Sequence, residues 1–278
     1  MIKNIKCAHV FAYAADTAIV IDHENLDSAV DLMKAELNNV AKWCHDYGLI
    51  INAKKSKLMY VRPVMFPMQP IKIYVENHCP MAQNVEKVPI EVVTTYKYLG
   101  VTVDDNLKWH CHVANIIQKL RKTSFALHHL RFCSNSNILC LVYSALAESY
   151  IRYGIAAWGS STHCTQLQKS QNRLLKIIKK SGCNKKFLSV ENIYKTTLLN
   201  EFYDINEFRQ VIDHTHATRL KTQGRYKTSK FWNLYSMNTL HCTIPRLLND
   251  LPASLLNISD VFRRKKLLKR HFLEGQIE

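Results

Sequence analysis

Three aspartates fall at positions where a carboxylate could do chemistry. Asp16 lies between two short apolar runs, and Asp104 and Asp105 are adjacent. Paired carboxylates can clamp the divalent ions with which enzymes activate a hydroxyl group and neutralise phosphates. However, Asp104 and Asp105 occur in a sequence typical of turns, where such side chains bond to nearby backbone. Asp16 alone supplies no two-metal site, so its simplest interpretation is a turn residue.

Cysteine and histidine offer no second metal centre. The nine cysteines run from Cys7 to Cys242 without regular spacing, which argues against a disulfide framework. A reducing compartment, nuclear or cytoplasmic, is favoured over secretion. The chain has no C-x-x-C pair, so we predict no zinc site. Residues 1–15 could pass for a short secretory signal, but their β-like pattern favours a strand.

The charge is unevenly distributed along the 278 residues. Residues 1–108 contain 12 lysines and arginines and 12 acidic residues, whereas residues 109–278 contain 26 and 10, which accounts for the net charge of +16. A basic surface confined to one region suits a polyanion, because neutralised phosphates release condensed counterions. No apolar run approaches the roughly 18 residues of a transmembrane helix. The composition therefore favours a nucleic-acid partner and no membrane; it leaves the oligomeric state open.

The elements that would position these residues change in type near residue 108. The first part predicts a β-hairpin with Asp16 at its tip, then a helix from Leu26 to Tyr47 with Asn25 as N-cap and Gly48 as its stop. Short antiparallel strands should follow at 49–51, 58–61, 71–75 and 96–103.

Helical periodicity dominates after Trp109. We predict helices at 109–132, 137–153, 164–180, 189–196, 199–216, between Pro245 and Pro252, and at 259–273. In the last of these, Phe262, Leu268 and Phe272 should form an apolar seam beneath the basic cluster 263–270, which we favour over a localisation signal. The fold class is therefore α+β, with one domain at 1–108 and a helical one at 109–278.

Several sequence pieces resemble, in order and spacing, the reverse transcriptases of non-LTR (LINE-type, jockey-like) retrotransposons. The string Phe-Ala-Tyr-Ala-Ala-Asp-Thr at 11–17 is similar to their catalytic hairpin, Tyr-x-Asp-Asp followed by Thr. The pieces that continue the resemblance are Trp43-Cys44, the run 48–57, 96–101, 150–154 with Trp158-Gly159, 168–178, and Leu251-Pro252 before a basic helix. The resemblance implies a partial polymerase palm followed by a thumb-like helical region.

The resemblance also implies where Mg²⁺ would bind in the family. One ligand comes from an aspartate on an earlier strand and another from the first Asp of the hairpin motif. Here that first position is Ala15, and only Asp16, matching the second Asp, remains. A methyl group cannot hold Mg²⁺, so Asp16 is a remnant and we expect no productive metal binding. The earlier strand and the fingers would precede Met1, so we expect a truncated, catalytically inactive polymerase.

The nucleic-acid contacts implied by the resemblance lie in two places. The hairpin around 96–101 matches the primer grip, and the helices after Trp109 match the thumb, which follows the primer–template duplex. Such contacts position a duplex of RNA or DNA without reading its sequence. The predicted binding residues are Tyr96, Lys97, Tyr98, Gly100, Lys119, Arg121, Lys122, Arg131, Lys169, Arg173, Lys176, Lys179 and Lys180.

Three hypotheses follow from this sequence. The first is a truncated retrotransposon RNA-directed DNA polymerase with residual nucleic-acid binding. The second is a host-retained nucleic-acid-binding protein without catalytic activity. The third is an unselected pseudogene product that folds poorly, because an unsupported hairpin would expose apolar side chains.

Overall fold

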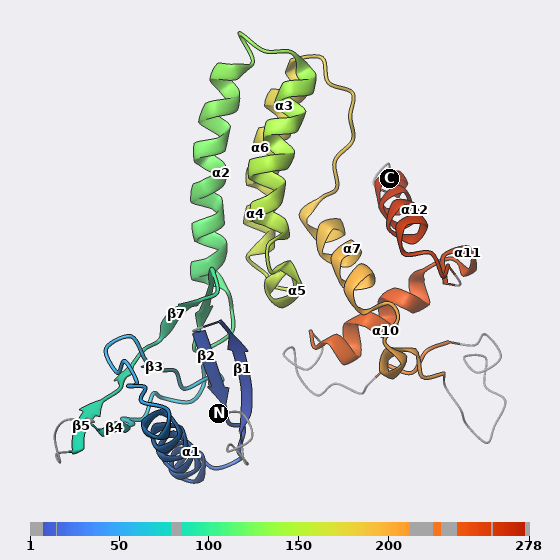
Figure 1. Cartoon of the computed structure of the whole chain (residues 1–278). Coiled ribbons are helices and arrows are strands. Elements are labelled where there is room, and N and C mark those ends of the chain that lie inside the picture. The colour runs from blue at the N-terminus through green and yellow to red at the C-terminus, as the bar shows by residue number, and fades with distance from the viewer. Residues whose placement is uncertain are drawn as a thin grey trace. The chain divides into compact units, whose positions relative to one another are not determined.

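The computed structural model describes residues 8–14, 16–78, 85–211, 225–228, 238–256 and 258–275. The chain divides into two compact units, Met1–Leu107 and Lys108–Glu278. The first combines one long helix with short strands, and the second is mainly helical (Figure 1). The predicted α+β class agrees with this mixture of helices and short strands.

In the first unit, the described strands pair two by two. β1 (His9–Tyr13) pairs antiparallel with β2 (Asp16–Val20). β4 (Tyr74–His78) pairs with β5 (Val85–Pro89), and β7 (Thr95–Tyr98) pairs with β8 (Val101–Asp104), both antiparallel. β3 (Lys57–Leu58) pairs with β6 (Glu91–Val92) in parallel, contrary to the antiparallel pairing expected throughout.

The helix of the first unit, α1 (Leu26–Asp46), begins and ends as the sequence predicts. Asn25 caps it, because its Oδ1 accepts from the Asp27 amide at 2.8 Å. Gly48 adopts φ +67° just after the helix, a conformation that side chains disfavour. Its apolar stripe, including Val30, packs against a small core around Ile73 and Val75.

Two of the predicted strands of this unit do not form. Residues 49–51 form no strand: the Leu49 amide donates to the Cys44 carbonyl at the end of α1, at 2.7 Å, and Leu49 and Ile50 are exposed. Residues 59–61 likewise have no strand partner. Pairing stops after Leu58, since β6 offers only two residues.

The second unit begins with three long helical segments that run beside one another (Figure 1). These are α2 (His110–Leu130), the continuous run of α3 (Ser136–Val142), a π-helical turn (Tyr143–Glu148) and α4 (Ser149–Arg152), and α6 (Cys164–Lys180). The short helix α5 (Ile155–Trp158) precedes α6. All three long segments match the predicted ranges to within three residues.

A buried amide and a glycine fix this bundle. Gln171 is fully buried in α6, and its Nε2 donates to the Tyr143 hydroxyl and to the Leu188 carbonyl, each at 2.8 Å. Gly159 lies so close to Tyr194 that an added Cβ would be 2.3 Å from Cδ2 of that ring. The Trp158-Gly159 pair therefore combines a buried indole with a position that admits no side chain.

The remaining helices differ more from the prediction. α7 (Val190–Phe202) runs through the expected break at 197–198, because Leu198 and Leu199 are both buried in the core. It then ends early: a 3₁₀ turn covers Asn206–Arg209, and residues 212–216 lie outside the described part. α10 (Leu240–Asp250) contains Pro245 rather than beginning at it; the buried proline ring lies within the helix.

The last helices, α11 (Ala253–Leu256) and α12 (Val261–Glu274), close a second core around Leu199, Tyr203 and Leu268. The expected apolar seam of α12 is wrong in one residue. Phe262 is 86% exposed, and Arg264 occupies the buried position one turn before Leu268.

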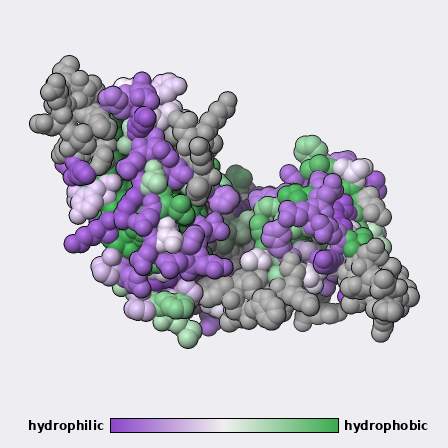
Figure 2. Space-filling model, turned by 90° about the horizontal axis from the view of Figure 1, so that it is seen from below, coloured by the Kyte–Doolittle hydropathy of each residue, from purple (hydrophilic) through white to green (hydrophobic). Residues whose placement is uncertain are grey.

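On the face of the molecule drawn in Figure 2, hydrophilic residues predominate and hydrophobic ones occupy smaller areas between them.

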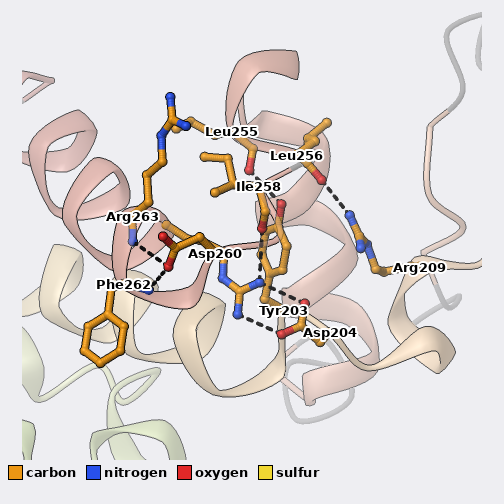
Figure 3. A network of polar contacts seen from close by, with 10 residues as sticks. Tyr203, Asp204, Arg209, Leu255, Leu256, Ile258, Asp260, Phe262 and Arg263 are labelled. Carbon is orange, nitrogen blue, oxygen red and sulfur yellow. Dashed lines mark hydrogen bonds and ion pairs between the residues drawn. The ribbon is translucent and has the colours of Figure 1, made fainter.

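Arg264 is held by a network of polar contacts (Figure 3). Its Nη1 and Nη2 donate to the two carboxylate oxygens of Asp204 at 2.8 and 2.7 Å. The guanidinium carbon lies 4.1 Å from the centre of the Tyr203 ring, whose hydroxyl donates to the Leu255 carbonyl at 2.7 Å. The ion pair lowers the pKa of Asp204 through the hydrogen bonds from Arg264. The network thus joins α12 to the end of α7.

Candidate nucleic-acid interface

Asp16 belongs to the β1–β2 hairpin. It pairs with Tyr13, and Ala14, which follows Tyr13, has φ +51°. The Asp16 side chain is exposed, and it is the first residue of β2 rather than a turn residue. Ala15 itself lies outside the described residues. No group of three potential metal-ligating side chains exists within the described ranges.

Asp104 ends β8 and Asp105 begins the turn that follows it, but the printed partners of the Asp105 carboxylate are side chains rather than the nearby backbone that was predicted. Both are buried at the end of β8. Oδ2 of Asp105 lies 3.2 Å from Nη2 of Arg62, and its backbone carbonyl accepts from the Arg62 amide at 2.9 Å. Asp105 therefore anchors the loop that follows residue 61. Arg62 was not singled out from the sequence, because an isolated arginine gives no signal of its partner.

The hairpin that resembles a primer grip is formed by β7 and β8. Its bend has positive φ at Leu99 (+45°) and Gly100 (+85°). Tyr96 and Lys97 are exposed, and the Tyr98 hydroxyl lies 3.5 Å from the Phe11 carbonyl of β1, to which it donates. The structure thus brings this hairpin next to the hairpin of Asp16. Contact of Tyr96, Lys97, Tyr98 or Gly100 with a nucleic acid stays a prediction.

The helices α2, α3 and α6 share a strongly one-sided charge. Residues 106–190 contain 13 lysines and arginines but a single acidic residue, Glu148. That carboxylate is itself paired with Arg152 at 2.7 Å. Because no other acid lies on these helices, their exposed cations form a surface of one sign.

The predicted cations of this region are solvent-facing, with one exception. Arg131 is half-buried and its guanidinium lies 4.4 Å from the centre of the Phe132 ring. Lys119 lies 4.7 Å from the Tyr150 ring and is exposed. The other exposed residues are Arg121, Lys122, Lys169, Arg173, Lys176, Lys179 and Lys180.

The structure brings two of these predicted residues together. Arg121 on α2 and Arg173 on α6 line one pocket of about 120 Å³ between the two helices, with Ser124, Ser170 and Leu120. Neither guanidinium has an acidic partner among the described residues. Two guanidinium groups and two hydroxyls converging on a small groove are suited to the oxygens of a phosphate. We call this the Arg121–Arg173 groove.

A second hollow continues the groove toward the beginning of both helices. It has a volume of about 180 Å³ and includes Arg121, Gln118 and Gln166 in its lining. His110 and His163 close its end, with ring centres 5.3 Å apart. Ser124 and Ser170 were not predicted from the sequence. Their signal was the spacing, since each serine is three residues from its arginine and so lies on the same helix face.

The titratable groups beneath this surface are neutral near neutral pH. Burial, aided by the charge of Lys119, lowers the pKa of His112 on the inner side of α2. Burial raises the pKa of the Cys164 thiol to about 11. Burial and the neighbouring Cys183 thiol raise that of Cys140 to about 11 as well. These groups therefore add no charge of their own to the basic surface.

Comparison with known proteins gives one informative similarity. The chain is 26% identical over 178 residues to a "Probable RNA-directed DNA polymerase from transposon X-element" of Drosophila melanogaster. The alignment covers 62% of this chain and 18% of that protein, so the chain spans less than a fifth of the length of the relative it matches. No family model and no solved structure matches. The similarity supports a relationship to transposon reverse transcriptases.

Among the helices within the described residues, none has the length and apolar character needed to cross a bilayer.

Proposed function

We propose that this chain is a non-LTR retrotransposon reverse transcriptase segment that binds a primer–template type of duplex but does not by itself extend a primer. The observation that supports the proposed binding is the Arg121–Arg173 groove, which lies within residues 106–190, a segment with 13 lysines and arginines and one acidic residue. Similarity to a probable RNA-directed DNA polymerase supports the same partner class, RNA or DNA. In this proposal the first unit is palm-derived and the second thumb-like.

The proposed lack of polymerisation follows from the metal ligands. Two-metal catalysis needs carboxylates that hold both ions between the hydroxyl and the phosphate. Ala15 occupies the position of the first motif Asp, and its methyl group cannot hold Mg²⁺. The exposed Asp16 is left as a single ligand at the hairpin. Mg²⁺ would therefore bind this hairpin no better than an ordinary surface carboxylate.

A non-enzymatic nucleic-acid-binding protein is the second candidate function, and Ala15 favours it. Such a protein needs the basic helices and not the hairpin. An unselected pseudogene product would instead fold poorly. Phe11 and Tyr13 of the hairpin are exposed, but these two side chains alone do not prevent a cooperative core from forming elsewhere in the chain. The many fully buried side chains of the second unit, including Trp158 and Leu120, lead us to expect one cooperative unfolding transition there.

Primer extension tests the proposal that this chain does not by itself polymerise DNA. The purified chain and an Ala15→Asp variant are each incubated with primer, RNA template, Mg²⁺ and labelled nucleotides, with a viral reverse transcriptase as positive control. We expect no extension in either, because restoring one carboxylate still leaves the family's ligand set incomplete. Incorporation by the unaltered chain would contradict the proposal.

A further inference from the structure

The end of α2 carries an exposed group of aromatic rings. Phe125, His128, His129 and Phe132 follow one another at the spacing that places side chains on one side of a helix. Phe125 and Phe132 are 70% and 74% exposed. The rings contact edge to face, with centres 4.4 Å apart for Phe125 and His129 and 5.9 Å for His128 and Phe132. A contiguous group of large, exposed aromatic side chains indicates a binding surface.

This aromatic group continues the Arg121–Arg173 groove. At 100° per residue, Arg121, Phe125 and His128 lie on the same side of α2, and Phe132 lies two residues beyond its end with its ring against that of His128. Arg121 also lines the groove with Arg173. The distance along the helix axis from Arg121 to Leu130, the last residue of α2, is about 14 Å, which is enough for a few nucleotides. A strand with its phosphates in the groove would therefore reach the rings with its bases.

The charge around the rings favours a polyanion over an apolar protein partner. Residues 106–147, which include the whole of α2 and α3, contain no aspartate or glutamate. The guanidinium of Arg131 lies 4.4 Å from the centre of the Phe132 ring, and Lys122 is exposed one turn before Phe125. Aromatic rings interleaved with cations form the surface on which unpaired bases stack while their phosphates are neutralised.

We propose that this aromatic group binds unpaired nucleotides of a strand whose backbone lies in the Arg121–Arg173 groove. The inference rests on the proposed nucleic-acid binding and adds a single-stranded ligand class to it. A duplex keeps its bases stacked on each other, so it engages the cations of the groove but leaves the rings free. The aromatic group should then distinguish a single strand from a duplex.

The test uses the full chain with Phe125 and Phe132 both replaced by alanine. Fluorescence anisotropy gives the affinity for a labelled oligothymidylate, for an abasic strand with the same number of phosphates, and for a blunt duplex. We expect the double variant to lose at least about tenfold in affinity for oligothymidylate, since each stacked base contributes substantially. Affinity for the abasic strand and the duplex should change less than about twofold.

Phe262→Ala provides the matched control, because Phe262 is 86% exposed on another basic helix, α12. It should leave all three affinities unchanged. Equal loss on the abasic strand, or no loss on oligothymidylate, would overturn the inference while leaving duplex binding intact. Absence of binding to every probe would instead reject the proposed function. Concentration-dependent self-association that disappears in the double variant would overturn the inference in favour of a protein contact.

Discussion

Replacing both Arg121 and Arg173 by glutamate is expected to weaken binding of a nucleic-acid duplex by about 100-fold at moderate salt. Each arginine lines the groove between α2 and α6 and has no acidic partner in the described part of the chain. A charge-assisted hydrogen bond contributes about 1.5–3 kcal/mol, and about 1.4 kcal/mol corresponds to a tenfold change in affinity. Glutamates in the groove also repel phosphates, which adds to the loss.

The control for this variant must change the net charge equally. Lys34→Glu with Lys42→Glu does so on α1, where both lysines are exposed. We expect this pair to reduce duplex affinity less than about threefold, through the general field alone. Equal weakening by the two double variants, measured by fluorescence anisotropy, would show that net charge rather than the groove governs binding.

Replacing Asp204 by alanine is expected to lower the free energy of unfolding by about 2 kcal/mol at neutral pH. The Arg264 side chain is only 3% exposed, so the variant would leave a buried guanidinium without its carboxylate. Breaking a fully buried pair costs about 3–5 kcal/mol. The expected value is smaller because Asp204 is 67% exposed and water can partly replace it.

Two further variants make this prediction specific. Adding Arg264→Met to Asp204→Ala should recover most of the loss, because no buried charge then remains unpaired. Glu207→Ala, which removes an exposed acid nearby, should change stability by less than about 0.5 kcal/mol. Chemical denaturation gives the free energy of unfolding of the unaltered chain, the double variant, its two single variants and Glu207→Ala. If the loss of unfolding free energy in the double variant equals the sum of the losses in its two single variants, the role given to the ion pair drawn in Figure 3 is contradicted.

The same ion pair sets a pH dependence. Hydrogen bonds from Arg264 lower the pKa of Asp204 in the folded state. The stability that the pair contributes is therefore fully present above the ordinary carboxyl pKa, about 3.9, and is lost as the pH falls through the lower folded value. The Asp204→Ala variant should lack this part of the acid destabilisation.

Much of the local structure could be predicted from the sequence because periodicity and capping act over short distances. Cys164–Lys180 was predicted to the residue, and Asn25 and Gly48 bound α1 as expected. The predictions that failed did so because the sequence does not show which other segment a residue contacts. Residues 49–51 have strand-like composition, but the backbone amide of Leu49 is already used by the end of α1.

The candidate site was predictable residue by residue but not as a groove. Arg121 and Arg173 stood out as cations on helices, yet 52 positions separate them in the chain. Only the packing of α2 beside α6 shows that they share a pocket with two serines. Arg264 shows the opposite case: within a basic cluster it resembled a surface residue, and its buried position depends on Asp204, far away in sequence.

Salt dependence of duplex binding tests the central claim, that this chain grips nucleic acid through the basic face of α2 and α6. Each neutralised phosphate contributes about −0.9 to the slope of log affinity against log salt concentration on B-form DNA. We predict a slope of about −3 or steeper for the chain, made shallower by about two in the Arg121→Glu, Arg173→Glu variant. A slope near zero, or one that this variant leaves unchanged, would contradict the claim.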